Sequence, residues 1–358
     1  MRAVLRTVFV VGLAVGLLAI FLRNADLARV WIAMQAARAD LLALALALTA
    51  VMYFVRAERW QYLLEPLGPT RFWAAFRTTV IGFAASFVLP ARAGEVLRPY
   101  LLAKQEQLPA TAAFATVIVE RILDLVAVLL LLGAFFVFFA GNAAAAAPRL
   151  YEAVALGGLV MVPVGIGILM LMFVMAGHPE RLHALVLKAE RVLPARLAHA
   201  VAGFARTFAE GLAVVRRPSR LAWALVWSLV LWLTIASQAW TVAHAFSIAL
   251  PFGGSFLITA MLVVGVALPT PGGVGGTHEA FRLGVTSFYG ADNDAAVGAA
   301  IVQHAINFAP VTLLGLWFLA RDGMNLSRLR EISSTARKDA AAADAGEGRT
   351  GNAREVTS

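Results

Sequence analysis

Successive apolar runs of about 20 residues, separated by shorter polar segments, most strongly constrain what this chain can fold into. A helix of about 20 apolar residues crosses the hydrocarbon core of a membrane. Of the 358 residues, 61% are hydrophobic and 14% are charged, with a mean hydropathy of +0.79. Soluble domains carry about 25% charged residues, and the two-residue alternation of membrane-spanning strands is absent here. The sequence therefore predicts an all-α, polytopic membrane protein.

Six of the apolar runs suit full crossings. They cover approximately residues 4–22, 41–55, 110–140, 151–176, 221–246 and 295–320. No small-x-small cleavage site directly follows the first run, so we expect it to stay as the first helix. Residues 23–40 read as a polar connector, and 1–330 as one integral membrane domain. Beyond it, residues 331–358 are small or charged, which predicts a disordered tail.

Basic residues predict the orientation of the crossings. The net charge is +9, and the positive residues gather in segments 56–77 and 177–220 and after residue 321. Such segments face the cytoplasm and meet anionic headgroups, so we expect the inner (cytoplasmic) membrane, cytoplasmic N- and C-termini, and no nucleic-acid partner. Part of 177–220 has the apolar spacing of an amphipathic helix on the membrane surface.

Cysteine is absent and the six histidines lack metal-ligand spacing, which excludes disulfides and thiol catalysis and argues against a metal site. No carboxylate pair in a soluble domain, nucleophile elbow or nucleotide motif stands out. We therefore expect no cofactor and no enzymatic activity.

Two apolar segments are too short, or too broken, to cross once each. Residues 72–89 end at Pro90, and residues 256–289 are interrupted from Pro269. The positive-inside pattern holds only if the first segment enters and leaves on the cytoplasmic side and the second does so on the outer side. The two prolines lie 179 positions apart, half the chain length. We predict two opposed re-entrant hairpins in an inverted repeat, with pseudo-repeats at about 41–176 and 221–322.

Charge concentrates beside the first break. Arg92, Glu95 and Arg98 follow Pro90 at helical i, i+3 spacing. Arginine forks match phosphate geometry, and a glutamate between them can orient them, so we interpret them as an anion-binding cluster. The alternative is an interfacial loop whose long side chains reach the headgroup region.

A second charged group lies in the long run that follows. Glu120, Arg121 and Asp124 share one helical stretch, with Arg121 and Asp124 as i, i+3 partners. An ion pair that holds two helices together and a contribution to the anion site are equally consistent with this pattern.

The second break is rich in glycine. Gly272, Gly273 and Gly275 precede Glu279, which falls in the first turn of the next helix. Successive backbone N–H groups there can form an anion nest, and the helix dipole favours the glutamate. The alternative is a tight turn that lets two half-helices pack closely.

Two further groups complete the candidates. His304 and Asn307 share a face of the last apolar run, where they line a polar path or make interhelical hydrogen bonds. Arg56, Arg59 and Trp60 end the second apolar run, and we expect them to be anchors at the membrane interface.

The combined motifs resemble the flippase-like transmembrane region of lysylphosphatidylglycerol synthases. They are Arg56-x-x-Arg59-Trp60, Leu89-Pro-Ala-Arg92-Ala-Gly94-Glu95-x-x-Arg98, Glu120-Arg121-x-x-Asp124 and Leu268-Pro-x-Pro271-Gly-Gly-x-Gly275-x-x-x-Glu279. In two-domain members this region is thought to move an aminoacylated phospholipid between leaflets, and a separate soluble domain makes that lipid. Stand-alone relatives are bacterial inner-membrane proteins, some linked to hopanoid or glycolipid pathways.

The resemblance and the motifs together imply a lipid flippase that moves an anionic, aminoacylated or glycosylated lipid between leaflets. The expected partner is a membrane lipid with an anionic headgroup, with a lipid-synthesis enzyme or glycosyltransferase as a further partner. The alternative function is an accessory protein or enzyme in lipid-headgroup or hopanoid biosynthesis.

Overall fold

The computed structural model describes residues 2–88, 93–141, 143–177, 211–212 and 216–321, and every regular element in them is helical. The predicted all-α class is confirmed. The first half contains α1 (Arg2–Leu22), α2 (Leu27–Ala36), α3 (Ala39–Leu64), the short turn η1 (Glu65–Leu67), α4 (Phe72–Val88), α5 (Gly94–Glu106), α6 (Ala110–Ala134), the π-helical turn η3 (Phe135–Phe139), α7 (Ala143–Ala146) and α8 (Pro148–Gly177). The second half contains α11 (Pro218–Ala245), α12 (Gly254–Ala267), the turn η5 (Pro271–Gly273), α13 (Gly276–Tyr289) and α14 (Asn293–Arg321).

Several predictions fall on residues that are not described. They concern Pro90, Arg92, most of the amphipathic segment 177–220 and the tail 331–358.

The long helices are those of a multi-pass membrane protein. Five helices of the described chain are long and apolar enough to cross a membrane, namely α3 with η1, α6 with η3, α8, α11 and α14. They correspond to five of the six predicted crossings. Helix α1 covers the remaining one, but only its part Gly12–Leu22 is found as a shorter apolar helix in the described chain, so that crossing stays a prediction. In α8 only 6% of the apolar window is buried inside the protein, so most of this helix is available to lipid.

The predicted polar connector 23–40 is largely helical instead. Asp26 begins α2, because its carboxylate accepts hydrogen bonds from the N–H groups of Ala28 and Arg29. The backbone N–H of Asp26 in turn donates to Asp294 at the start of α14. This hydrogen bond ties the connector between α1 and α2 to the N-terminal end of α14.

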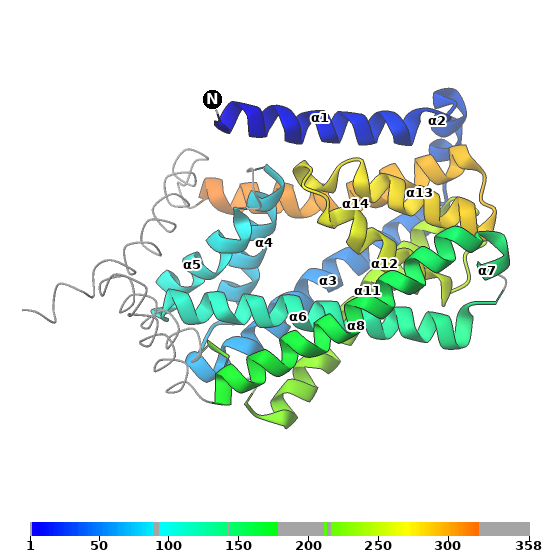
Figure 1. The fold of residues 1–358 in the computed structure, drawn as a ribbon. Coiled ribbons are helices and arrows are strands. Elements are labelled where there is room, and N and C mark those ends of the chain that lie inside the picture. Colours follow the sequence, from blue (N-terminus) through cyan, green and yellow to red (C-terminus); the bar gives the residue numbers. More distant parts are fainter. Residues whose placement is uncertain (1, 89–92, 142, 178–210, 213–215, 322–358) are drawn as a thin grey trace, which may run out of the picture.

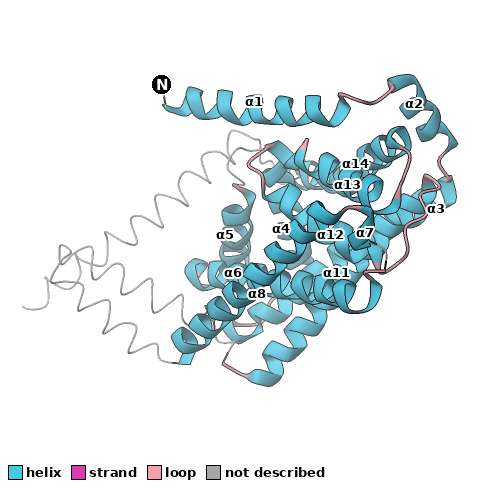
Figure 2. Ribbon diagram, turned by 45° about the vertical axis from the view of Figure 1, so that its right-hand side comes forward, coloured by secondary structure: helices cyan, strands magenta, loops and turns pink. Residues whose placement is uncertain are grey.

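Different helices lie at the two ends of the bundle. In Figure 1 the N-terminal end of α1, the α4–α5 pair and the C-terminal end of α14 lie towards the left, whereas α2 and α7 lie at the right. Figure 2 shows the same order after rotation, with α1 along the upper edge and α2 at its right-hand end. The N-terminal end of α1 and the C-terminal end of α14 therefore lie on the same side of the described bundle.

Both short apolar segments fold back as helical hairpins, α4–α5 and α12–α13. A glycine pair lies where the arms of each hairpin cross, Gly82 with Gly94 and Gly265 with Gly276. A Cβ atom on Gly94 would overlap the carbonyl oxygen of Gly82, and one on Gly276 would overlap the carbonyl oxygen of Gly265. The same device, glycine at the point of closest backbone approach, closes both hairpins.

We expect Gly94→Ala to destabilise the protein, although alanine normally favours a helix by about 1 kcal/mol over glycine. The added methyl group meets backbone that cannot rotate away, and overpacking of this kind costs about 1–3 kcal/mol. The thermal midpoint in detergent should fall. Gly133→Ala in α6 is the matched control, because its Cβ would have no neighbour within 4 Å; an equal fall there would refute the explanation.

The packing between the halves is reciprocal. Helix α3 packs along α11, α4 packs on α14, and α12 packs on α6. If α3, α4–α5 and α6 correspond to α11, α12–α13 and α14, each of these contacts has its counterpart under a two-fold rotation. Such reciprocity is what an inverted repeat requires, although the repeat itself stays a prediction.

Candidate functional site

A cluster of buried charges lies between α3, α5, α6 and α11. Its centre is Glu120, which is fully buried. The Oε1 atom of Glu120 accepts hydrogen bonds from Arg98 Nη1 at 3.1 Å and Arg121 Nη2 at 2.6 Å. Arg59 Nη2 and Arg56 Nη1 lie 3.2 and 3.8 Å from the same oxygen. One carboxylate therefore faces four guanidinium groups; we call these residues, with Asp124, the arginine cluster.

Asp124 is the second carboxylate of the cluster and accepts hydrogen bonds from α3 and α11. Arg59 Nη1 donates to both Asp124 and the hydroxyl of Ser228 on α11, and the indole N–H of Trp232 donates to Asp124 at 2.9 Å. Arg121 Nη2 lies 3.5 Å from the second carboxylate oxygen. The sequence pairing of Arg121 with Asp124 is confirmed, and the contacts extend it to two further helices.

Aromatic rings support two of the arginines. The guanidinium carbon of Arg98 lies 3.8 Å from the centre of the Trp60 ring, and that of Arg56 lies 4.7 Å from the centre of the Phe83 ring. Such contacts are attractive because the ring face is negative. They hold the guanidinium planes in fixed orientations beside Glu120.

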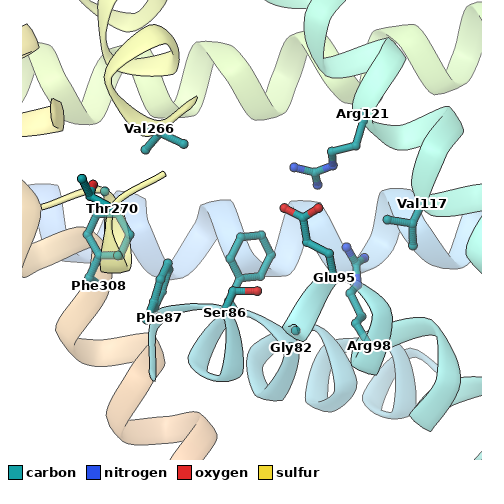
Figure 3. Close-up of a pocket in the computed structure, with 14 residues that line it drawn as sticks. Gly82, Ser86, Phe87, Glu95, Arg98, Val117, Arg121, Val266, Thr270 and Phe308 are labelled. Atoms are coloured by element: carbon teal, nitrogen blue, oxygen red, sulfur yellow. The ribbon is translucent and has the colours of Figure 1, made fainter. Parts of the chain in front are cut away.

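The arginine cluster carries more positive than negative charge. Its four arginines face two carboxylates, and Glu95 is a third acidic neighbour, which acts electrostatically on Arg121. In Figure 3 the Glu95 carboxylate points towards the Arg121 guanidinium. With all three acids counted, one positive charge remains in excess among these described residues. Buried charges need partners, so this excess favours an additional anion.

Unsatisfied donors point to the same conclusion. Among the described residues, no hydrogen-bond partner is found for the buried Nε and Nη2 atoms of Arg98 or the buried Nε atom of Arg121, and one oxygen each of Glu120 and Asp124 is likewise without one. Guanidinium N–H groups are donors only. The two arginines therefore retain hydrogen-bonding capacity that a phosphate oxygen would satisfy.

These two arginines line a pocket of about 100 Å³ where the hairpins meet; we call it the hairpin pocket. Its other walls include Ser86 from α4 and Thr270 and Gly272 from the second hairpin. Figure 3 shows the charged side chains at one end and Val266, Thr270 and Phe308 at the other. Residues that follow the first break and residues of the second break therefore line one pocket, whereas Pro90 and Arg92 of the first break lie outside the described residues.

A larger cavity of about 190 Å³ adjoins the hairpin pocket; we call it the apolar cavity. The two share Phe83, Phe87, Val266 and Phe308 in their linings. Apolar side chains form most of its wall, and its polar groups include Gln303 and His304 from α14. A charged space and an apolar space side by side suit a ligand that is itself amphiphilic.

The glycines of the second break adopt left-handed backbone conformations, with φ of 59° at Gly272, 72° at Gly273 and 84° at Gly275. Gly272 and Gly273 line the hairpin pocket. The N–H groups of Gly273 and Gly275 already donate to Thr270 O and His278 Nδ1. Two amides of the predicted anion nest are therefore used within the turn, which favours the tight-turn alternative at these positions.

The remaining candidates lie in different surroundings. His304 lines the apolar cavity, and its Nδ1 atom lies 3.2 Å from the Thr277 hydroxyl. Glu279 lines neither cavity and pairs with Arg282, which also donates to Asn293. A role of Glu279 in the pathway stays a prediction. Arg92 lies outside the described residues, so its expected contact with Glu95 is not described.

The prediction that Arg56, Arg59 and Trp60 anchor the chain at the interface is wrong. All three are buried, and Arg59 and Trp60 have no exposed surface. They enter the protein because Glu120 and Asp124 on α6 supply the opposite charge, and because Trp60 Nε1 donates to Thr116 Oγ1 at 3.0 Å. The sequence held a signal for this pairing. Glu120 and Asp124 lie one helical turn apart, as do Arg56 and Arg59, so the two pairs could have been matched as partners on facing helices.

The fold and this site together define a polytopic helical membrane protein whose two hairpins enclose an arginine-lined pocket. The chain belongs to the family described as the lysylphosphatidylglycerol synthase TM region, whose model matches residues 7–315. The resemblance drawn from the motifs is thereby confirmed.

Two curated relatives are similar to this chain. Glycosyltransferase AglD of Haloferax volcanii is 28% identical over 340 residues, which cover 88% of this chain and 54% of AglD. UPF0104 membrane protein MJ1595 of Methanocaldococcus jannaschii is 33% identical over 84 residues, 23% of this chain and 25% of that protein. The chain therefore spans about half the length of AglD. Family and relatives support a membrane role in lipid or glycolipid pathways.

Proposed function

We propose that this protein is a non-enzymatic lipid transporter that moves a lipid with an anionic headgroup between the leaflets of the cytoplasmic membrane. One observation carries the proposal: a positively charged pocket between two hairpins adjoins an apolar cavity, with which it shares four lining residues. This pairing of surfaces matches a phospholipid, whose phosphate needs donors and whose chains need apolar walls.

The headgroup phosphate would bind to Arg98 and Arg121. Arg98 presents unsatisfied N–H groups from a fixed position over Trp60. Arg121 is about 40% exposed along its side chain, so it can turn towards a ligand without unpacking the cluster. Charge-assisted hydrogen bonds from arginine to phosphate are short and strong.

The broken hairpins supply the route. Non-helical backbone at membrane depth is tolerated only where protein or water covers it, and here Gly94, just after the first break, and Gly272, within the second, line the hairpin pocket. A headgroup held there is separated from the lipid chains by Phe87 and Phe308, whose rings touch at 4.4 Å between centroids. Movement of these rings would connect the pocket with the apolar cavity.

A reconstitution assay tests the proposal. The protein is placed in vesicles that contain headgroup-labelled phosphatidylglycerol or phosphatidylcholine, and loss of label to a membrane-impermeant quencher is followed. We expect faster loss for the anionic lipid than in protein-free vesicles, with the lipid recovered chemically unchanged. Absence of acceleration with every anionic lipid tested would refute transport.

The similarity to AglD over 88% of this chain favours a second candidate. Under it the protein is an accessory protein or enzyme for lipid-headgroup or hopanoid biosynthesis. That candidate requires a covalently altered lipid, or a glycosyltransferase partner, rather than a change of leaflet. Mass spectrometry of the vesicle lipids after the same incubation separates the two.

The proposal places both termini in the cytoplasm, and the absence of cysteine makes the orientation directly testable. Single cysteines can replace two exposed residues, Arg71 just before α4 and Phe252 just before α12. Each marks the membrane face from which its hairpin is expected to enter. We expect an impermeant thiol reagent to label Phe252→Cys in intact cells and Arg71→Cys only after lysis. Labelling of both from the same side would exclude opposed hairpins.

A further inference from the structure

Two histidine rings contact each other beside the apolar cavity. His278 on α13 and His304 on α14 have ring centroids 4.5 Å apart, and His304 also stacks on Phe308 at 4.1 Å. His278 is buried, whereas His304 is half-buried and lines the cavity. The hydrogen bonds around them determine which ring nitrogens carry protons.

His278 has its proton on Nε2. The backbone N–H of Gly275 donates to His278 Nδ1 at 3.3 Å, and a backbone N–H is never an acceptor. Nδ1 must therefore be unprotonated. Protonation of His278 at Nδ1 would break this bond, which caps the first turn of α13, so this histidine is held neutral by the fold.

His304 has the opposite tautomer. The Thr277 hydroxyl donates its only hydrogen to the carbonyl oxygen of Gly273 at 2.8 Å. With that hydrogen on Gly273 O, we assign the 3.2 Å contact between Thr277 Oγ1 and His304 Nδ1 as a hydrogen bond donated by His304; the NMR experiment below tests this against donation by Thr277 to an unprotonated Nδ1. The proton lies on Nδ1 and the lone pair on Nε2, for which the described residues offer no hydrogen-bond partner. Only His304 can take up a second proton without losing a bond.

The wall of the apolar cavity is uncharged in the described chain, and the nearest guanidinium group identified by a contact is that of Arg56, which lies over the ring of the lining residue Phe83. No arginine, lysine, aspartate or glutamate is among the described residues that line the apolar cavity. The titratable groups that face His304 are His278 on α13 and Tyr53 on α3, whose hydroxyl contacts Asn307 O at 3.5 Å. The side-chain oxygens of Gln303 and Thr259, also in the lining, are buried without a hydrogen-bond partner in the described chain. These groups can accept or donate to a polar ligand.

We propose that the apolar cavity contains a second, proton-dependent subsite for the anionic headgroup, in which His304 accepts a proton on Nε2 and pairs with the phosphate. This inference rests on the proposed transport function and deepens it. A lone charge in apolar surroundings is costly unless it is paired, so proton and phosphate favour each other's entry. The headgroup would pass from the permanently charged arginines to a site that is charged only when protonated.

Nitrogen NMR of the histidines tests the subsite without relying on transport. The full chain, labelled with 15N-histidine, is placed in nanodiscs of phosphatidylcholine or phosphatidylglycerol. His304→Gln assigns the His304 signal and His244→Gln that of His244. We expect neutral His304 to carry its proton on Nδ1, and its titration midpoint to rise by about one pH unit in phosphatidylglycerol, which corresponds to about 1.4 kcal/mol.

His244 is the internal reference for the surface potential of the anionic bilayer. Its Nδ1 lies 3.0 Å from the Trp240 carbonyl oxygen, outside the apolar cavity. If the anionic surface alone acts, His304 should shift no more than His244, and that result overturns the subsite. A neutral His304 with its proton on Nε2 overturns it as well.

Thr277→Val provides a second arm. It removes the acceptor that fixes the tautomer and keeps the side-chain shape. Neutral His304 should then show both tautomers, and unchanged protonation on Nδ1 would contradict the assignment. A lipid-dependent titration of His304 together with failure of the quenching assay would retain the subsite and reject transport, so the two claims fail separately.

Discussion

Glu120→Gln should cause the largest loss of stability of any single substitution in the arginine cluster. The amide removes the negative charge that Arg56, Arg59, Arg98 and Arg121 face. Removing one partner of a buried ion pair costs about 3–5 kcal/mol, because the remaining charge is left without compensation. We expect a sharp fall in the thermal midpoint in detergent, or failure to recover folded protein.

Glu65→Gln is the matched control. Glu65 also pairs with an arginine, Arg220, at 3.2 Å, but its side chain is 57% exposed. Exposed pairs contribute about 0–1 kcal/mol, so its thermal midpoint should stay close to that of the wild type. If both variants unfold at the same temperature, the arginine cluster does not hold the helices together in the way described.

Arg121→Gln should abolish most lipid movement while the fold persists. Arg121 lines the hairpin pocket and is the most exposed arginine of the cluster, and Glu120 keeps its contacts with Arg59 and Arg98. A hydrogen bond to a charged group contributes about 1.5–3 kcal/mol. Because 1.4 kcal/mol is a factor of ten, we expect a fall of about 10- to 100-fold in the rate for an anionic lipid.

Arg29→Gln serves as control for the change in net charge, since Arg29 is 74% exposed and lies 3.7 Å from Asp26 away from both cavities. Its transport rate should match that of the wild type. Equal losses in the two variants would mean that overall charge, rather than the pocket, determines the rate. Unfolding of Arg121→Gln would assign that arginine to the scaffold.

The hairpins could be predicted because proline, glycine and charge interrupt apolar runs that are too short to cross. Their glycine crossings could not, since the pairing of Gly82 with Gly94 depends on how the two arms approach each other. Helix α2 was missed because its 10 residues are too few to cross a membrane and charged residues lie on both sides of it. Its start at Asp26 is stabilised by a side-chain cap and by a contact with Asp294, 268 positions away.

At the site, sequence reasoning found Arg98, Glu120 and Arg121 because charge within apolar runs is rare. It placed Arg59 at the interface because the residue ends an apolar run. The partners that bury it, Asp124 and Ser228, lie 65 and 169 positions away. Glu279 drew attention through its place in the second break, but Arg282, three residues later on the same helix face, already pairs with it. The i, i+3 spacing of Glu279 and Arg282 would have predicted this ion pair from the sequence.

The central claim is that the pocket between the hairpins receives an anionic headgroup. Ser86→Cys tests it most directly, because Ser86 lines the hairpin pocket and the chain contains no other cysteine. The measurement is the rate at which a negatively charged and a positively charged thiol reagent of similar size modify this cysteine in nanodiscs.

We predict that in phosphatidylcholine the anionic reagent reacts faster than the cationic one, and that phosphatidylglycerol slows the anionic reagent by occupying the pocket. Arg121→Gln in the same background should remove both differences. Equal rates for the two reagents, together with no protection by the anionic lipid, would contradict the account.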